Sequence, residues 1–360
     1  MEPALLPWQT NQWQQLFARA NEETLPHALL LAGPRGIGKN RFANRLVQTL
    51  LCAMPDRNNG PCGHCKSCIL YQAESHPDVL VPVPKENNQV VTIRKMRDSS
   101  ETLATPDEDN KAIGIDQIRD VIEFLALKSQ YGKYKIVVIS PATALNTNAA
   151  NALLKALEEP AARTVLILVS ERPESLLPTI RSRCQRIDFE LPASEDTRQW
   201  LMSQGDYGDN LDLLLELAGG APLAAKALSA SGVVGKYEDM LGDLERLFTH
   251  KADPVIVAAN WIKWGLIQPV TWLRGFIMDM IRLKSASEPV TLSHPHAQKQ
   301  LQLFIKTLNL KELFGFLDRL NELTKLAGSQ VNRQMLMEEA LIYWSQLARI
   351  SHKTAQARKA

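Results

Sequence analysis

A strand-like run that passes directly into a phosphate-binding loop constrains this chain more than any other feature of its sequence. Residues Ala28–Ala32 are all apolar, and Gly33–Asn40 have the pattern G-x-x-x-x-G-K-N. In such a loop the glycines let backbone N–H groups turn toward phosphate oxygens, and the lysine reaches the outer phosphates. Because the loop joins a buried strand to a helix, it predicts an α/β domain built on a parallel sheet.

Further apolar runs extend this prediction along the first half of the chain. Short runs rich in Val, Ile or Leu predict buried parallel strands at 28–32, 79–82, 135–140 and 164–170. Helical patterns lie between them, at 41–51, 115–127 and 147–159. The polar stretch 85–112 is expected to be a surface excursion. After residue 192 the strand pattern stops, and apolar spacings of three and four residues predict helices to residue 351.

Length and composition set only broad bounds. A chain of 360 residues predicts roughly two or three domains, and its net charge of +2 gives no overall attraction to nucleic acid or membranes. No apolar stretch approaches the roughly 20 residues of a membrane span. The first residues lack a basic region followed by an apolar core, so we expect no signal peptide and a cytoplasmic protein.

Two positions of the metal site expected at the phosphate loop lack a suitable ligand. Asn40 replaces the Ser or Thr hydroxyl that would bind Mg²⁺, and the strand 135–140 ends in Ser140–Pro141 where a P-loop ATPase carries carboxylates. We therefore expect no Mg²⁺-dependent hydrolysis. Two interpretations stay open: binding of ATP or ADP without hydrolysis, and a tight strand-to-helix turn with no ligand. The candidate nucleotide-binding residues are Gly33, Gly36, Gly38, Lys39 and Asn40.

Four of the five cysteines fall within residues 52–68. Cys62, Cys65 and Cys68 form two overlapping C-x-x-C pairs, and Cys52 lies ten residues upstream. Four thiolates close a tetrahedral shell with no open position, so the spacing predicts a structural zinc site. An iron–sulfur cluster is a second interpretation, and unliganded surface thiols are a third. Cys184 is expected to be a buried small hydrophobe.

Two further motifs connect these features. Residues 151–160 have the sequence N-A-L-L-K-A-L-E-E-P, and S-R-C follows at 182–184. Together with the loop and the cysteines, this combination resembles the clamp-loader branch of the AAA+ ATPases. The resemblance implies an α/β AAA+ parallel-sheet domain at 1–190 with a zinc module at 52–68. It also implies a small helical lid domain at 191–235 and an all-α collar and oligomerisation domain at 236–360.

The resemblance implies a role for Arg183, the arginine of S-R-C. In this family that residue projects into the nucleotide site of a neighbouring subunit, where its permanent charge neutralises the γ-phosphate. Members that hydrolyse ATP carry a lid arginine, and residues 219–224 contain none. The chain thus resembles a stator that lacks turnover and supplies an arginine finger to an adjacent subunit. A surface arginine or a salt bridge is the competing interpretation.

The same resemblance implies partners. These are the gamma/tau and delta subunits of the clamp loader of bacterial DNA polymerase III and, through the complex, the sliding clamp and primed DNA. The chain would then be a subunit of a DNA-directed DNA polymerase, a nucleotidyltransferase, active in DNA replication. Lys155 is a candidate DNA contact, with Arg119 beside it, and solvated helix charges are the alternative.

Two other classes of function account for part of the sequence. An autonomous AAA+ ATPase that remodels nucleic acid or protein would need the carboxylates that are missing at Ser140–Pro141. A zinc-dependent nucleic-acid binder would need a basic patch beside the cysteines, and the near-neutral net charge argues against it.

Overall fold

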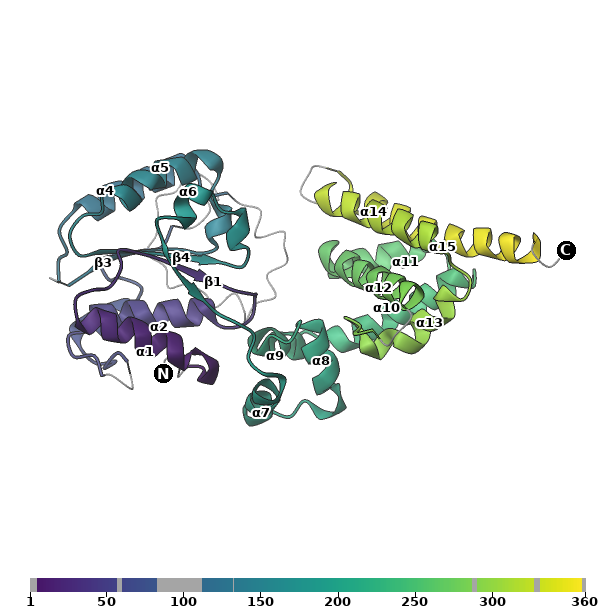
Figure 1. The fold of residues 1–360 in the computed structure, drawn as a ribbon, viewed down its shortest axis with the longest axis horizontal. Helices are drawn as coiled ribbons and strands as arrows, with labels where there is room; N and C mark the ends of the chain where they lie inside the picture. The colour runs from purple at the N-terminus through teal and green to yellow at the C-terminus, as the bar shows by residue number, and fades with distance from the viewer. Residues whose placement is uncertain are drawn as a thin grey trace. The chain divides into compact units, whose positions relative to one another are not determined.

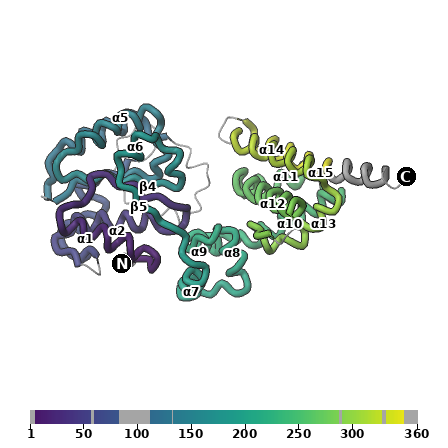
Figure 2. Tube along the Cα trace, in the orientation of Figure 1, coloured from purple at the N-terminus to yellow at the C-terminus, as the bar shows by residue number. Residues whose placement is uncertain are grey.

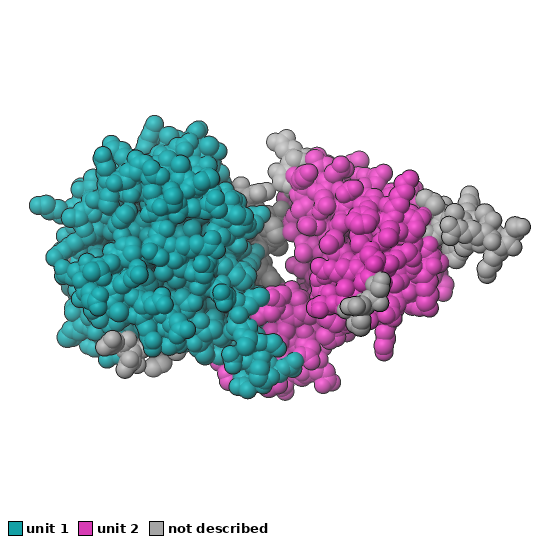
Figure 3. All heavy atoms as spheres, in the orientation of Figure 1, with its two compact units in different colours: residues 1–104, 108–201, 221–227 teal, residues 105–107, 202–220, 228–360 magenta. Residues whose placement is uncertain are grey.

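The computed structural model describes residues 5–56, 60–82, 112–131, 133–286, 290–326 and 331–357. The chain divides into two compact units (Figure 3). The first comprises residues 1–104, 108–201 and 221–227, and the second comprises residues 105–107, 202–220 and 228–360. The surface excursion predicted at 85–112 lies outside the described residues, apart from residue 112 itself. The domain boundaries at 190 and 235 stay predictions.

The first unit is built on a parallel sheet (Figure 1). Its strands are β1 (Ala28–Ala32), β2 (Val79–Leu80), β3 (Lys135–Ile139), β4 (Thr164–Ser170) and β5 (Gln185–Asp188). Among the described residues they form a five-stranded sheet in the order β2-β3-β4-β1-β5, and every pairing is parallel. The register of β1 with β4 runs from Ala28 opposite Leu166 to Ala32 opposite Ser170. The predicted α/β parallel sheet is therefore confirmed.

The sequence predicts four of these strands and misses β5. The prediction is correct to the residue for β1 and β4, while β2 is shorter than the predicted 79–82. In β5, the side chains of Gln185, Arg186 and Asp188 are exposed and only Ile187 is buried. An edge strand of this kind has no continuous apolar run, so the pattern of a strand buried on both faces does not detect it.

Helices cover both faces of the sheet. One face carries α1 (Thr10–Asn21) and α2 (Lys39–Leu51), and the other carries α4 (Ile115–Ala126), α5 (Thr147–Glu158) and α6 (Pro178–Arg181) (Figures 1 and 2). Alternate residues of each strand point to opposite layers. Leu29 packs in the same core cluster as Phe42 of α2, whereas Leu30 packs with Leu153 of α5. Burial on both faces explains why the central strands are continuous apolar runs.

The described residues of the second unit form helices and connecting turns. Its helices are α8 (Leu211–Leu217), α10 (Val233–Phe248), α11 (Pro254–Trp261), α12 (Ile267–Ser285), α13 (Gln298–Ile305), α14 (Leu310–Leu326) and α15 (Arg333–Ala357). Helix α12 packs against α13 and α14, and α15 packs against α10 and α11. Trp261 is fully buried, and its Nε1 donates to Asp243 Oδ2 at 2.9 Å. The predicted helical region is therefore confirmed.

Two helices, α7 (Ser194–Gln204) and α9 (Pro222–Ala230), contain residues from both units. The part of α9 up to residue 227 groups with the first unit because it packs on the phosphate loop. No helix of the described chain is long and apolar enough to cross a membrane.

Candidate functional site

The phosphate loop follows β1 at the edge of the sheet where the strands end. Gly36 and Gly38 have φ angles of +77° and +88°, which L side chains rarely adopt. A Cβ on Gly36 would also lie 2.5 Å from the Cβ of Ala224 on α9. Glycine is therefore required at Gly36 both by the turn and by the close approach of α9.

Lys39 is turned back onto its own loop. Its Nζ donates to the carbonyl oxygens of Gly33 at 2.8 Å and Pro34 at 2.6 Å. Lys39 is only 5 % exposed, and this burial is the main cause that lowers its pKa to about 8. The charge of Glu171 opposes the shift, and that of Arg35 adds to it. A bound phosphate would have to draw the ammonium group away from these carbonyls.

The loop keeps N–H donors that a phosphate would need. In the described chain, no protein group accepts a hydrogen bond from the backbone N–H of Gly36, Ile37 or Gly38. The carbonyl side is occupied: Gly36 O accepts from the N–H of Leu223 at 3.0 Å, and Ile37 O accepts from Gln9 Nε2 at 2.9 Å. The N-terminal segment and α9 thus fix the loop, while its amide side remains able to bind an anion.

The two positions expected to ligate a metal bind each other. Ser140 Oγ donates to Asn40 Oδ1 at 2.7 Å. Ser140 follows β3, which is not adjacent to β1 because β4 lies between the two strands. Ser140 nevertheless reaches Asn40 at the start of α2. Both groups are neutral, so neither brings the negative charge that a Mg²⁺ site uses.

Arg183 lies at the end of the sheet where the parallel strands begin, and the phosphate loop lies at the other end, where the strands finish. It comes just before Gln185, which is opposite Leu29 near the start of β1, whereas the loop begins after Ala32. At about 3.3 Å per residue, the five residues of β1 separate the two edges by roughly 16 Å. Arg183 therefore cannot reach the phosphate loop of its own chain.

Arg183 makes two polar contacts with the residues that the structure describes. Its Nη2 lies 2.6 Å from Glu158 Oε1, and its Nη1 donates to the carbonyl oxygen of Thr179 at 3.0 Å. The salt bridge that was the competing interpretation of Arg183 is thus present. The Arg183 side chain is still 36 % exposed, so it remains accessible from solvent.

Lys155 and Arg119 lie on neighbouring helices. Lys155 is exposed in the last turn of α5, and the described residues provide no ion-pair partner for it. Arg119 lies on α4, which packs against α5, and its Nη1 is 3.0 Å from Asp116 Oδ1. Because Asp116 already neutralises Arg119, Lys155 is the better of the two candidates for a phosphate contact.

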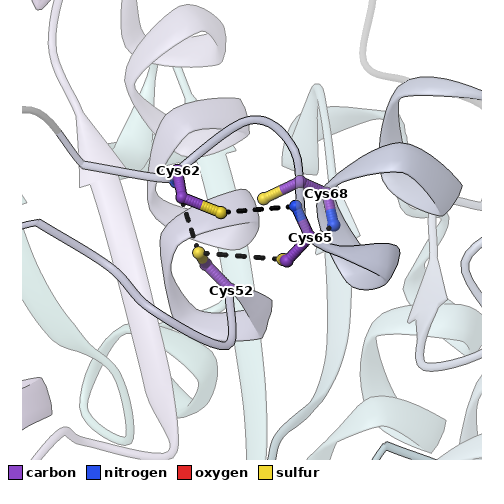
Figure 4. A group of neighbouring side chains, drawn as sticks. All are labelled: Cys52, Cys62, Cys65 and Cys68. Atoms are coloured by element: carbon purple, nitrogen blue, oxygen red, sulfur yellow. Dashed lines mark hydrogen bonds between the residues drawn. The ribbon is translucent and has the colours of Figure 1, made fainter.

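The four cysteines of the predicted metal site converge (Figure 4). Their Sγ atoms all lie within 4.8 Å of one another. Cys52 follows α2, Cys62 and Cys65 belong to the turn before α3 (Lys66–Gln72), and Cys68 lies within α3. Cys184 is buried in the core between the sheet and α5, as predicted.

Backbone N–H groups donate to three sulfur atoms of this cluster, those of Cys52, Cys62 and Cys65, while burial raises the pKa of the Cys52 and Cys68 thiols. The N–H of Cys62 donates to Cys52 Sγ at 3.3 Å, and that of Cys65 donates to Cys62 Sγ at 3.4 Å. Burial raises the pKa of the Cys65 thiol, but hydrogen bonds from the N–H groups of Ala53 and Cys68 outweigh it, and the pKa falls to about 6. Four converging sulfurs with such donors can hold a metal such as zinc.

A buried polar network connects the cysteine module to the sheet. His76 is fully buried and its Nδ1 accepts a hydrogen bond from the N–H of Asp78 at 3.1 Å, so its Nε2 carries the ring proton and donates a hydrogen bond to Ser67 Oγ at 2.7 Å. Asp78, also fully buried, pairs with Lys135 of β3 at 3.6 Å. No local spacing in the sequence predicts this network, because Asp78 and Lys135 are far apart in the chain and only the pairing of β2 with β3 brings them together.

Comparisons with known proteins relate both parts of the chain to one family. Residues 8–193 match the family described as DNA polymerase III, delta subunit, and residues 234–346 match DNA polymerase III, delta subunit, C terminal. The DNA polymerase III subunit delta' of Pseudomonas aeruginosa is 33 % identical over 347 residues, covering 95 % of this chain and 98 % of that protein. The subunit of the same description from Escherichia coli is 30 % identical, covering 93 % and 94 %.

Among solved structures, a DNA polymerase III gamma subunit-related protein from Thermotoga maritima aligns with 94 % of this chain and 99 % of its own. Its sequence identity is 20 % and its TM-score is 0.44.

Proposed function

This chain belongs to the delta-prime family of DNA polymerase III subunits, and on that premise we propose that it is the non-hydrolysing stator of a clamp loader. Its partners would be the gamma/tau and delta subunits in the cytoplasm, and the complex would load the sliding clamp on primed DNA during replication. Its chemical contribution would be Arg183, acting as an arginine finger in the nucleotide site of a neighbouring ATPase subunit.

One observation carries this proposal. At the two positions expected to ligate a metal, Asn40 and Ser140 are hydrogen-bonded to each other. The partly exposed Arg183 lies at the other end of the parallel strands from the phosphate loop. An arginine placed there could reach a nucleotide site only if that site belonged to another molecule. A planar, permanently charged guanidinium suits the stabilisation of charge on a transferring phosphoryl group.

The test is reconstitution of the clamp loader with Arg183→Ala. We expect the DNA-stimulated ATPase rate to fall at least about 10-fold, since arginine fingers of GTPases contribute 10³–10⁵ in rate. Arg186→Ala is the matched control because Arg186 is an exposed arginine nearby that pairs with Asp188. An unchanged rate with Arg183→Ala would refute the finger assignment.

The competing function, an autonomous AAA+ ATPase, makes a different prediction. It requires steady ATP turnover by the isolated chain, and Lys39→Ala would abolish that turnover. Finding such turnover would overturn the stator proposal. The neutral Asn40–Ser140 pair argues against this function.

We also propose that Cys52, Cys62, Cys65 and Cys68 hold a structural zinc ion. Four sulfur donors leave no open coordination position, so the ion would stabilise the module and perform no chemistry. An iron–sulfur cluster would give visible absorption that zinc does not, which distinguishes the two metals.

The loop Gly33–Asn40 is proposed to hold ATP or ADP weakly, without metal. Support comes from the N–H groups of Gly36, Ile37 and Gly38, which have no acceptor among the described residues. Trp8 donates to Ile37 O at 3.0 Å and would report binding through its fluorescence. Titration with ADP in EDTA tests this, and the absence of any change at millimolar ADP would favour a loop without ligand.

Lys155 is proposed to contact the phosphate backbone of primed DNA. It is exposed and unpaired within the described chain, so it is available for sequence-independent attraction. Lys155→Glu in the reassembled complex is expected to weaken DNA-dependent clamp loading and its dependence on salt. Unchanged loading and an unchanged salt response would leave Lys155 as a solvated helix charge.

A further inference from the structure

We propose that Glu158 is a positioning residue for Arg183, an inference that rests on the proposed function. Glu158 is the last residue of α5, and its Oε1 lies 2.6 Å from Arg183 Nη2. The two residues come from the two motifs at 151–160 and 182–184, so this contact joins them in space.

Two anchors fix the plane of the guanidinium group. Glu158 holds Nη2, and the carbonyl oxygen of Thr179 holds Nη1 at 3.0 Å. Because the guanidinium is planar and rigid, contacts on two of its nitrogens determine its orientation. Its remaining N–H groups have no other partner in the described part of the chain and stay available for a phosphate.

The helix end itself is an unfavourable place for Glu158. The last turn of a helix carries partial negative charge and favours cations, yet α5 ends in Glu158 and is followed by Glu159. Only Glu158 of the two pairs with Arg183. The position is therefore explained by the arginine it holds rather than by the helix.

Stability does not account for the contact either. The side chains of Arg183 and Glu158 are 36 % and 49 % exposed, and ion pairs at such exposure contribute little to folding. The contact would instead orient the long, flexible arginine before it reaches the neighbour's phosphate. A side chain that is already oriented needs less reorganisation in the transition state.

The opposite role for Glu158 makes an opposite prediction. If the carboxylate instead competed with the neighbour's phosphate for Arg183, its removal would raise the ATPase rate. The positioning role predicts a loss, which falls on kcat because the ATP itself would be bound by the neighbouring subunit. The sign of the change therefore distinguishes the two roles.

The experiment uses the reconstituted clamp loader with Glu158→Ala, Glu158→Gln and the control Glu159→Ala. We expect Glu158→Ala to lower the DNA-stimulated kcat about 3- to 10-fold with little change in KM for ATP. Glu158→Gln should retain more activity because it keeps the length of the side chain and an oxygen that could contact Nη2, and Glu159→Ala should match the wild type. In an Arg183→Ala background, Glu158→Ala should have no further effect.

Equal thermal unfolding of the variants would exclude a folding defect, and a variant that unfolds earlier would be assayed below its transition. An unchanged or higher kcat with Glu158→Ala overturns the inference, as does a further loss in the Arg183→Ala background. If Arg183→Ala itself has no effect, the proposed function fails. If Arg183→Ala lowers the rate and Glu158→Ala does not, only the positioning role fails.

Discussion

Among single residues, Lys39 is the one whose contacts bear most directly on phosphate binding by this loop. Its ammonium group is satisfied by two carbonyl oxygens of its own loop and is almost fully buried. Burial disfavours the charged form, so the pKa of Lys39 is about 8 in the folded chain compared with 10.5 for an ordinary lysine.

This pKa predicts a pH dependence of stability. Between pH 8 and 10.5 the unfolded chain keeps the Lys39 proton that the folded chain loses, so the free energy of unfolding rises with pH across this window. The contribution of Lys39 is about 3 kcal/mol at most, at about 1.4 kcal/mol per pKa unit. Urea denaturation of wild type and Lys39→Met measures it: the rise should be smaller in the variant. Identical pH profiles would contradict the shift.

Residues that meet across long sequence separations are the part of the site that sequence patterns do not reveal. The glycines, Lys39 and the four cysteines lie within short segments, and their local spacing alone predicts a phosphate loop and a metal cluster. Asn40 and Ser140 are a hundred residues apart, and Arg183 meets Glu158 through packing of α5 beside α6. These contacts depend on the strand order and helix packing, which local spacing does not specify.

Among the elements, the cysteine module is the one in which four sulfur atoms converge. It comprises the segment 52–68, and the helix that begins at its end, α3 (Lys66–Gln72), has only seven residues. Its sulfur atoms converge without a disulfide, since all the cysteines are free thiols. A bound metal would therefore supply the cross-link that holds this segment together.

Zinc analysis of Cys65→Ser tests this at the level of the element. The reduced wild-type chain is expected to carry about one zinc per molecule and the variant clearly less, with a lower Tm. Cys184→Ala is the control, because Cys184 lies in the core away from the cluster and should leave the zinc content unchanged. Wild-type protein with much less than one zinc per chain would count against the site.

The Asp78–Lys135 pair makes a second prediction for this region. Burial raises the pKa of Asp78, but hydrogen bonds from the N–H groups of Gln130 and Tyr131, from Ser129, and the charge of Lys135 outweigh it and lower the pKa below 3.8. The stabilisation is therefore present above pH 3.8 and is lost as the pH falls below it.

Asp78→Asn would leave Lys135 buried without its counter-charge. We expect a loss of about 3–5 kcal/mol in the free energy of unfolding at pH 7, the range measured for broken buried ion pairs. Asp120→Asn, an exposed change on α4, should alter it little. Chemical denaturation of the two variants decides, and equal stability would mean that Lys135 finds another partner.

The central strands of the sheet were predictable for the same reason that β5 was not. Strands buried on both faces must be apolar throughout, and this constraint is visible in β1 and β4. At the edge, β5 needs only Ile187 on the buried side, and its identity as a strand comes from pairing with β1. The edge strand β5 is thus specified by its neighbour more than by its own residues.

At the scale of the whole molecule, the proposed function requires an assembly surface. Ile256 on α11 and Met335 on α15 are each 64 % exposed, and these two helices pack against each other. Exposed apolar side chains on neighbouring helices are typical of subunit interfaces.

A double variant tests this surface in the complete chain. Ile256→Asp with Met335→Asp is expected to prevent co-elution with gamma and delta subunits in size-exclusion chromatography, while zinc content and Tm stay at wild-type values. Met202→Asp changes a similarly exposed apolar residue, 59 % exposed on α7, and should leave assembly intact. Normal assembly of the double variant would place the interface elsewhere.

The placement of the phosphate loop and Arg183 at opposite edges of the sheet gives the subunit a polarity. If each domain in a row placed its arginine in the nucleotide site of the next domain, all the domains would face the same way. Head-to-tail contacts of this kind build rings or filaments. Under the proposed function, a member that supplied an arginine but had Asn40 and Ser140 in place of metal ligands would be the last in the row and would have no working site of its own. A clamp loader containing this chain would therefore have fewer hydrolytic sites than AAA+ domains, and counting bound transition-state analogues per complex would measure the difference.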